Sequence, residues 1–382
     1  MSVDVALSRV LQVSAFYPAH GGGIEVVAGK LAEGLVNEGI QLTWMAGGAV
    51  EEEPAERNDM QIERAASVDF CERYLGLPLP LWGLASLRKL WNEVHRAQLV
   101  QVHDYLYFPS LITLLFAWWL RRPVVLTQHI GWIEFNSVVA RCILRLLNHT
   151  LGRLVLSRVG RVIYVSRPVA DYWAAVLRTE QSGKVIANGV DHQRYSPSAR
   201  APGKGVLEFL FVGRFVEKKG IDLLKSCLDI PGVHWTFVGR GPLSPRQWKE
   251  AEQITVLEGL RAEEVVRYYQ QADLLVLPSK GEGFPLVIQE SLACGTPVLV
   301  SDEVRLAFPH VDERCVFSAD VSGRDAENQL RQTLRQLAGA PEDLRQARSF
   351  AERLSRQWSW ECCVKAYLRS YRELVCSFSG CN

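Results

Sequence analysis

The stretch DLLVLPSKGEGFPLVIQE, residues 273–290, changes its pattern once, at the glycines near its middle. Its first part, DLLVLPS, is almost entirely apolar, as expected of a strand that is buried on both faces of a sheet. The Gly-Phe-Pro that follows predicts a turn, and Pro285 suits the first position of a helix. A strand, a tight turn and a helix in succession form the repeating unit of a parallel sheet.

The same unit recurs along the whole chain. Helical periodicity, with apolar residues three and four apart, fills most segments between the apolar runs, as at 24–39. Strands alternating with helices in this way predict parallel sheets covered on both faces. The apolar runs lie at 9–17, 40–48, 60–65, 99–103, 123–129, 161–166 and 184–190, and in a second series at 208–214, 234–240, 254–259, 273–279, 296–302 and 315–320.

A polar segment with prolines and glycines, residues 191–205, separates the two series and predicts a linker. We therefore expect an α/β fold with two Rossmann-like, doubly wound domains, 1–190 and 206–358, facing an interdomain cleft. A chain of 382 residues with 48% hydrophobic and 22% charged residues is long enough to give each domain its own core.

Composition also excludes several classes of protein. Lys and Arg total 43 against 42 Asp and Glu, so nucleic acid is not an expected partner. The nine cysteines contain no C-x-x-C pair, which argues against zinc and against a disulfide framework, and favours the cytoplasm. The N-terminus lacks the pattern of a signal peptide. The longest apolar run, 111–120, is shorter than the ~20 residues of a bilayer span.

The loops that end the strands hold the candidate ligand-binding groups, because ligands of doubly wound sheets bind there. Three glycines, 21–23, follow the first strand and either let the backbone approach an anionic group or form a simple tight turn. Arg214 and Lys219 share one loop of the second series. Together they can neutralise a diphosphate, although a solvated loop is the alternative.

Two glutamates flank the turn at the start of the helix. The amides of 286–288 and the positive end of the helix dipole suit the same diphosphate. Glu290 lies about 8 Å further along the helix, roughly a ribose length, and can accept the ribose hydroxyl groups. Glu282 precedes the helix, on the side where a transferred group would lie.

The block SKGEGFPLVIQESLACGTPVLVSD, residues 279–302, resembles the donor-binding motif of the retaining family 4 glycosyltransferases, whose fold is GT-B. Its mark is the Glu-x7-Glu pair. Two positions depart from the pattern of the family: Arg240 stands where an acidic residue is common, and Gln101 stands where a histidine is common. The likeness extends over most of the chain, to the segments 21–23, 128–132, 187–191, 213–220 and 271–279.

The resemblance implies roles for individual residues. Arg214 and Lys219 would bind the diphosphate and Glu290 the ribose, while Glu282 and His129 would contact the donor sugar, His129 from the first domain. It also implies that the first domain binds the acceptor and the second the nucleotide sugar, and that residues 359–382 form a helix crossing back to the first domain. The other expected donor-binding residues are Gly22, Gly23, Gly283, Phe284, Pro285 and Leu286.

The function so implied is a retaining transfer of a sugar from a nucleotide-diphosphate donor to a saccharide or lipid-linked saccharide, in surface polysaccharide or glycolipid assembly. The chain has no Asp-x-Asp, so we expect no metal and no other cofactor. Instead of a nucleophilic carboxylate, the family implies attack by the acceptor on the face that the diphosphate leaves. The alternatives are a GT-B-like nucleotide-sugar epimerase and a non-catalytic partner protein of the same fold.

A basic helix is predicted at 138–161, and it suggests where the protein works. It would form a basic amphipathic helix on an anionic membrane surface, placing the enzyme on the inner face of the cytoplasmic membrane. The alternative is an ordinary domain helix with solvated arginines. Its basic row is Arg141, Arg145, His149 and Arg153, and its opposite apolar side is Ile143, Leu144, Leu147, Leu151 and Leu154.

Overall fold

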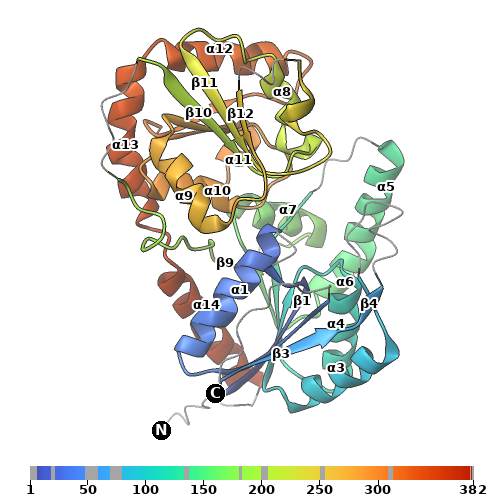
Figure 1. The fold of residues 1–382 in the computed structure, drawn as a ribbon. Coiled ribbons are helices and arrows are strands. Elements are labelled where there is room, and N and C mark those ends of the chain that lie inside the picture. Colours follow the sequence, from blue (N-terminus) through green and yellow to red (C-terminus); the bar gives the residue numbers. More distant parts are fainter. Residues whose placement is uncertain are drawn as a thin grey trace. The chain divides into compact units, whose positions relative to one another are not determined.

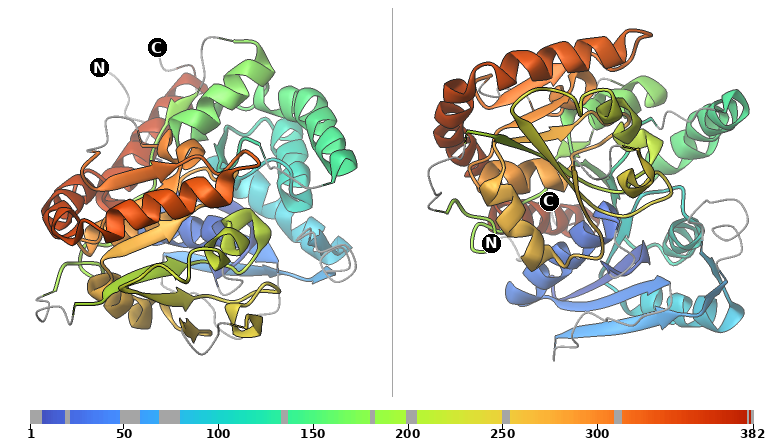
Figure 2. Two further views of the ribbon diagram at one scale, coloured as in Figure 1. Left: turned by 90° about the horizontal axis from the view of Figure 1, so that it is seen from above. Right: turned by 45° about the horizontal axis from the view of Figure 1, so that its top comes forward.

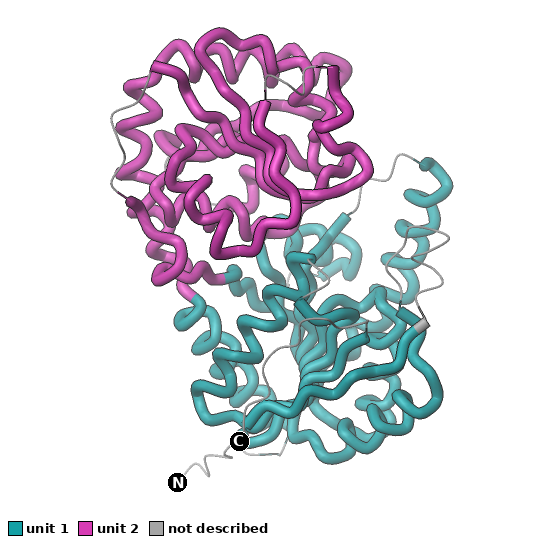
Figure 3. The backbone as a smooth tube through the Cα atoms, viewed as in Figure 1, with its two compact units in different colours: residues 1–188, 360–382 teal, residues 189–359 magenta. Residues whose placement is uncertain are grey.

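The chain folds into two compact α/β units, which confirms the predicted fold class (Figure 1). The first unit comprises residues 1–188 and 360–382, and the second comprises 189–359 (Figure 3). The roles assigned to the two domains, acceptor binding and nucleotide-sugar binding, stay predictions. The computed structural model describes residues 7–18, 22–47, 59–68, 80–132, 137–179, 183–198, 205–249, 254–308, 313–378 and 380.

The first unit is built on a sheet of seven parallel strands in the order β3-β2-β1-β6-β7-β8-β9. Every run predicted as a strand in this half forms one, although the last is shorter than 184–190 because it pairs with the edge of β8 at two positions only. The strands are β1 (Arg9–Phe16), β2 (Gln41–Gly47), β3 (Met60–Ala65), β6 (Leu99–His103), β7 (Val124–Gln128), β8 (Arg161–Tyr164) and β9 (Lys184–Val185), and a small antiparallel pair is formed by β4 (Ser67–Val68) and β5 (Leu81–Trp82).

The C-terminal helix belongs to the first unit, as predicted, although the chain reaches it only after completing the second. It lies beside α1 in both Figure 1 and Figure 2 and shares one apolar core with it. The helices of this unit are α1 (Gly23–Asn37), α3 (Leu84–Arg96), α4 (Phe108–Trp119), α5 (Val138–Leu147), α6 (Arg153–Leu156), α7 (Arg167–Leu177) and α14 (Trp360–Phe378), with a π-helical turn η2 (Asn148–Gly152).

Two tyrosines of α14 anchor it to the centre of the sheet. Tyr371 donates from Oη to Gln101 Oε1 at 2.9 Å, and Tyr367 Oη lies 3.1 Å from Thr127 Oγ1. Gln101 in turn donates to Thr127 at 2.7 Å, so these four buried polar groups satisfy one another. Gln101, a departure from the family pattern, therefore serves to hold the crossing helix.

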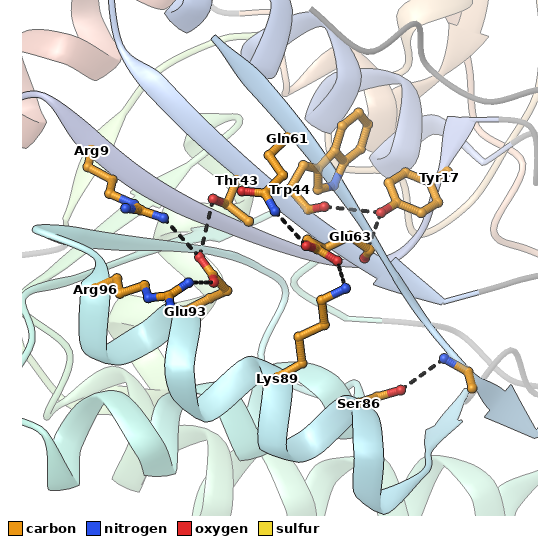
Figure 4. A network of polar contacts seen from close by, with 11 residues as sticks. Arg9, Tyr17, Thr43, Trp44, Gln61, Glu63, Ser86, Lys89, Glu93 and Arg96 are labelled. Atoms are coloured by element: carbon orange, nitrogen blue, oxygen red, sulfur yellow. Dashed lines mark hydrogen bonds and ion pairs between the residues drawn. The ribbon is translucent and has the colours of Figure 1, made fainter. Parts of the chain in front are cut away.

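Two buried glutamates, each in an ion pair with a basic side chain, connect α3 to the first three strands (Figure 4). Glu93 is buried and accepts from Arg9 at 3.2 Å and from Arg96 at 2.9 Å. Glu63 on β3 is buried as well and forms an ion pair with Lys89. Each buried charge has a partner of opposite sign, as its burial requires.

The predicted continuous helix at 138–161 is interrupted by η2, where Asn148 points inward. Asn148 accepts a hydrogen bond from Tyr105 and donates one to Tyr172 at 2.7 Å. A Cβ on Gly152 would lie 2.9 Å from the Trp173 ring, so the backbone is packed tightly there. A π turn contains an extra residue and shifts the phase of everything after it.

The five residues of the predicted apolar side differ in burial. Of its five members, only Leu144 is buried, Leu147 and Leu151 are half-buried, and Ile143 and Leu154 are exposed. The exposed surface of α5 therefore mixes apolar and basic side chains.

The second unit has a six-stranded parallel sheet in the order β12-β11-β10-β13-β14-β15. In both sheets the order reverses beside the first strand, between β1 and β6 and between β10 and β13, which is where doubly wound sheets bind ligands. The elements are β10 (Leu207–Val212), β11 (Val233–Val238), β12 (Ile254–Leu257), β13 (Leu274–Leu277), β14 (Val298–Ser301), β15 (Val316–Ala319), α8 (Ile221–Lys225), α9 (Ala262–Gln271), α10 (Leu286–Ala293), α11 (Asp302–Arg305), α12 (Ala326–Ala338) and α13 (Pro341–Ser355), with 3-10 turns η3 (Glu217–Lys219) and η4 (Pro245–Gln247).

We expect that ending the chain after residue 355 lowers the free energy of unfolding of the first unit by several kcal/mol. The loss of α14 would expose the apolar surface of α1 and leave Gln101 without its tyrosine donor. Hydrogen exchange of β1 and β6 amides measures this unit by itself. A chain that ends after Phe378 is the matched control and should exchange as the full chain does. Unchanged protection of β1 and β6 in the shorter chain would contradict the prediction.

Candidate active site

The loop after β10, residues 213–220, packs against the end of β13. Gly220 adopts a φ of 69°, and a Cβ on it would lie 2.3 Å from the Pro278 carbonyl oxygen, so only glycine fits. The Lys280 amide donates to the Lys218 carbonyl at 2.9 Å. These contacts bring the loop of the two predicted cations onto the loop that carries Glu282.

The two loops meet through an ion pair. Lys219 Nζ lies 2.9 Å from Glu282 Oε1, and Lys218 Nζ lies 3.9 Å from the same oxygen. The Glu282 side chain is only 13% exposed. Arg214, by contrast, is exposed and has no ion pair with any residue in the described part of the chain. The structure thus brings Lys219 and Glu282 together, adds Lys218 to them, and leaves Arg214 available.

The electrostatics of this group favour an anion. Burial alone would raise the pKa of Glu282, but the Lys219 and Lys218 ammonium groups and the Arg214 guanidinium hold it below its usual value. Burial lowers the pKa of Lys218, an effect that Glu282 opposes and that Lys219 and Arg214 reinforce. Three cations therefore act on Glu282, and a second carboxylate, Glu303, acts on Lys218. Three positive charges against these two carboxylates leave the group with an excess of positive charge.

Helix α10 begins at Leu286, one residue later than predicted. Pro285 is its N-cap, with an extended ψ of 121°, rather than its first helical residue. The Ile288 amide donates to the Pro285 carbonyl at 3.2 Å. Three amides, those of 286–288, were predicted to bind phosphate. Because the Ile288 amide already donates within the turn, the prediction now applies to the amides of Leu286 and Val287.

The turn before α10 is held by an aromatic cluster. Phe284 is buried, and its ring lies 4.8 Å from that of Phe308 and 5.7 Å from that of Trp358. Gly283 beside it is buried too. Because the Phe284 ring is packed in this way, its part in donor binding would be to fix the turn rather than to touch the donor.

Glu290 on α10 is held by hydroxyl groups. Tyr269 donates from Oη to Glu290 Oε2 at 2.8 Å. Burial raises the pKa of Glu290, while hydrogen bonds from Tyr269 and Tyr195 partly offset the rise. Tyr195 lies in the segment predicted as a linker, and neither tyrosine was identified from the sequence. Two tyrosine hydroxyl groups therefore already donate to the predicted ribose ligand.

The predicted glycine loop of the first unit leads into α1, which starts at Gly23 after the N-cap Gly22. A Cβ on Gly23 would meet no atom within 4 Å, whereas one on Gly22 would lie 1.9 Å from Glu25 Oε2. The Glu25 carboxylate thus covers the start of the helix, where its charge is favourable. The sequence held a signal for it, since a glutamate three residues after an N-cap commonly folds back in this way. Gly21 lies outside the described residues.

His129 follows β7 and lies next to a second histidine that the sequence analysis did not single out. His129 Nε2 is 3.0 Å from Nδ1 of His103, the last residue of β6, and both rings are buried. Burial lowers the pKa of His129 to about 3 and that of His103 well below its usual value. Both imidazoles are therefore neutral at neutral pH.

We expect the first unit to lose stability as the pH falls below 6.5, the usual histidine pKa, towards about 3. In that window the unfolded chain binds protons at His103 and His129 that the folded unit does not. Proton uptake by each histidine in the unfolded chain should lower the free energy of unfolding by about 2 kcal/mol at pH 5 relative to pH 7. Urea unfolding at the two pH values measures the loss, which should be smaller in His129→Asn.

The exposed His149→Asn variant serves as the control and should lose as much stability as the wild type. Equal losses in the wild type and in His129→Asn would contradict the assignment of a buried neutral ring.

Two Rossmann-like units, each with its candidate groups at a reversal of strand order, define a protein of the GT-B fold. Comparison with known families places it further. A model described as Glycosyltransferase Family 4 matches residues 21–194, and one described as Glycosyl transferases group 1 matches residues 207–338. The chain belongs to the family 4 glycosyltransferases.

Individual relatives agree with this assignment. An uncharacterized glycosyltransferase from Methanocaldococcus jannaschii is 27% identical over 96% of this chain and 99% of its own. A phosphatidyl-myo-inositol mannosyltransferase from Propionibacterium freudenreichii is 27% identical over 72% of this chain and 71% of its own.

Solved structures show the same fold. Sucrose-phosphate synthase from Thermosynechococcus elongatus matches with a TM-score of 0.78 at 19% identity, over 97% of this chain and 100% of that one. Anabaena HepE in complex with UDP matches with a TM-score of 0.72 at 14% identity, over 96% and 100%. The chain is thus a glycosyltransferase of the GT-B type.

Proposed function

We propose that the enzyme transfers a sugar, with retention and without a metal ion, from a nucleotide-diphosphate donor to a saccharide or lipid-linked saccharide. The observation that carries the proposal is the cluster of Arg214, Lys218 and Lys219 around Glu282. It lies at the carboxyl ends of β10 and β13, where the strand order reverses. HepE, a structural neighbour, binds UDP, which supports a donor of the same class.

The chemistry assigned to this cluster is stabilisation of the leaving group. The acceptor hydroxyl oxygen forms a bond to the anomeric carbon on the face from which the diphosphate departs, and its proton passes to a phosphate oxygen. The negative charge that develops on the diphosphate is met by Arg214 and Lys219. To reach it, Lys219 exchanges its contact with Glu282 for one with a phosphate oxygen.

The remaining site residues hold the donor. Glu290, oriented by the Tyr269 and Tyr195 hydroxyl groups, accepts from the ribose, and His129 binds the donor sugar from the first unit. Glu282, released from Lys219, faces the sugar. A surface polysaccharide or a glycolipid is the product class proposed, and the named activity of the mannosyltransferase relative supports a lipid-linked acceptor.

A panel of UDP-glucose, UDP-N-acetylglucosamine and GDP-mannose tests the proposal. Transfer, or slow hydrolysis of one donor, would support it. Interconversion of the sugar without transfer would indicate an epimerase, and the absence of turnover and of nucleotide binding would indicate a non-catalytic protein.

With the active donor, we expect Arg214→Ala or Lys219→Ala to lower kcat/KM roughly 10- to 150-fold, because each removes a charge-assisted bond worth about 1.5–3 kcal/mol. Lys225→Ala, a nearby exposed lysine, is the matched control and should leave kcat/KM unchanged.

We expect Glu290→Ala to raise the KM for the donor, because its partner is the static nucleoside. Glu282→Ala should mainly lower kcat, because its partner is the sugar in motion. Initial rates over a range of donor concentrations separate the two effects. Indistinguishable kinetics of the two variants would contradict this division of roles.

We further propose that α5 holds the enzyme on an anionic membrane surface, at the inner face of the cytoplasmic membrane. Val139 and Leu146 on this helix are 67% and 64% exposed, and Arg145 is exposed beside them. Apolar side chains among cations suit a surface of anionic headgroups. Trp118 and Trp119 at the end of α4 are also largely exposed. No helix in the described ranges is long and apolar enough to cross a membrane.

We expect the protein to float with phosphatidylglycerol liposomes at low salt. Changing Arg141, Arg145 and Arg153 together to Ser should weaken binding about 100-fold, at about 1 kcal/mol for each cation. The control is Arg335, Arg345 and Arg356 of the second unit changed together to Ser, which removes the same charge from exposed positions. Absence of flotation, or equal weakening by both triple variants, would contradict the proposal.

A further inference from the structure

The two buried histidines of the first unit are joined by an in-plane hydrogen bond. His103 Nδ1 and His129 Nε2 are 3.0 Å apart, the ring centroids are 5.3 Å apart, and the ring planes differ by 29°. The centroid separation is close to the N···N distance plus the distance from each nitrogen to the centroid of its own ring. The rings therefore meet edge to edge, with one proton between the two nitrogens.

The backbone of both histidines is held by further hydrogen bonds, which involve Asp104 and Ser110. Asp104 Oδ1 accepts from the His129 amide at 2.8 Å, and the Asp104 amide donates to the Thr127 carbonyl at 2.8 Å. Asp104 has a φ of 53°, in the left-handed region that non-glycine residues rarely adopt. Ser110 donates from Oγ to the His103 carbonyl at 3.2 Å. A strained residue held by this many contacts is typical of a functional site.

Two arrangements of protons satisfy a neutral pair. In the first, His103 donates from Nδ1, so its Nε2 is bare and His129 carries its own proton on Nδ1. In the second, His129 donates from Nε2, so its Nδ1 is bare and His103 has an N–H at Nε2. His103 Nε2 is buried and has no hydrogen-bond partner among the described residues. The second arrangement would leave a buried N–H there without an acceptor, whereas the first leaves only an acceptor nitrogen without a donor. Buried N–H groups without an acceptor are rarer in proteins than unused acceptors, which favours the first arrangement.

We propose that His103 is a positioning residue of the transfer reaction: it donates to His129 Nε2 and so holds His129 with its N–H at Nδ1, directed to a hydroxyl oxygen of the donor sugar. This inference rests on the proposed function, because it needs His129 to contact the sugar. Nδ1 of His129 is the atom left for a ligand, since no described residue bonds to it. His103 itself does not touch the donor and acts through the tautomer and orientation of His129.

Two variants of His103 distinguish this role from simple packing. His103→Asn places an amide N–H donor close to the position of the ring Nδ1, whereas His103→Leu fills much of the same space without a donor. With the active donor of the panel, His103→Leu should lower kcat about tenfold, and His103→Asn should restore most of the loss. Urea unfolding of both variants shows whether each is folded.

The tautomer is measured directly on the full chain without donor. In ¹⁵N-histidine-labelled protein, His129, assigned through its absence in His129→Asn, should carry its proton on Nδ1 in the wild type and in His103→Asn. In His103→Leu it should shift to Nε2 or to a mixture. A proton on Nε2 in the wild type, an unchanged tautomer in folded His103→Leu, or equal kcat in wild type and His103→Leu would each overturn the inference.

The two proposals can fail separately. A wild-type chain that turns over no nucleotide sugar overturns the proposed function, and with it the role of His103 in transfer, even if the tautomer is as stated. Normal turnover with the other tautomer overturns only the inference about His103.

Discussion

The close approach of Gly220 to Pro278 is the constraint on which the candidate active site depends. A Cβ at residue 220 would lie 2.3 Å from the Pro278 carbonyl oxygen, so glycine alone lets the two loops touch. That contact puts Lys219 within 2.9 Å of Glu282. Because β10 and β13 are neighbours at the reversal of strand order, the pair stands where a parallel sheet presents a ligand site.

The two units share a principle in the way they prepare their candidate groups. In the second unit, Glu282 forms an ion pair with Lys219 and holds the cation in a largely buried position. In the first, His103 occupies one nitrogen of His129 and leaves the other for a ligand. Both arrangements fix a side chain through a partner on the neighbouring strand or loop, which reduces the ordering that a ligand must impose.

The sequence predicted the strands and α14 well, because strands buried on both faces give long apolar runs and a packed helix gives spacings of three and four. It predicted too the loops that hold Arg214, Lys219 and Glu282. It did not reveal the partners: His103 meets His129 only because β6 lies beside β7, and Tyr195 reaches Glu290 from a segment with the composition of a linker. The π turn at Asn148 escaped prediction, and the hydrogen bond that Asn148 accepts there comes from Tyr105, a residue distant in the sequence.

The central claim is that Lys219 is held by Glu282 until a diphosphate takes its place. Calorimetric titration with the nucleoside diphosphate of the active donor tests it most directly, since this ligand lacks the transferred sugar that Glu282 would contact. The titration compares wild type, Glu282→Gln and the double variant Lys219→Ala/Glu282→Gln. The account predicts that Glu282→Gln binds the nucleoside diphosphate about tenfold more tightly than wild type and that the double variant loses this gain. Binding that is weaker in Glu282→Gln, or the same as in wild type, would contradict it.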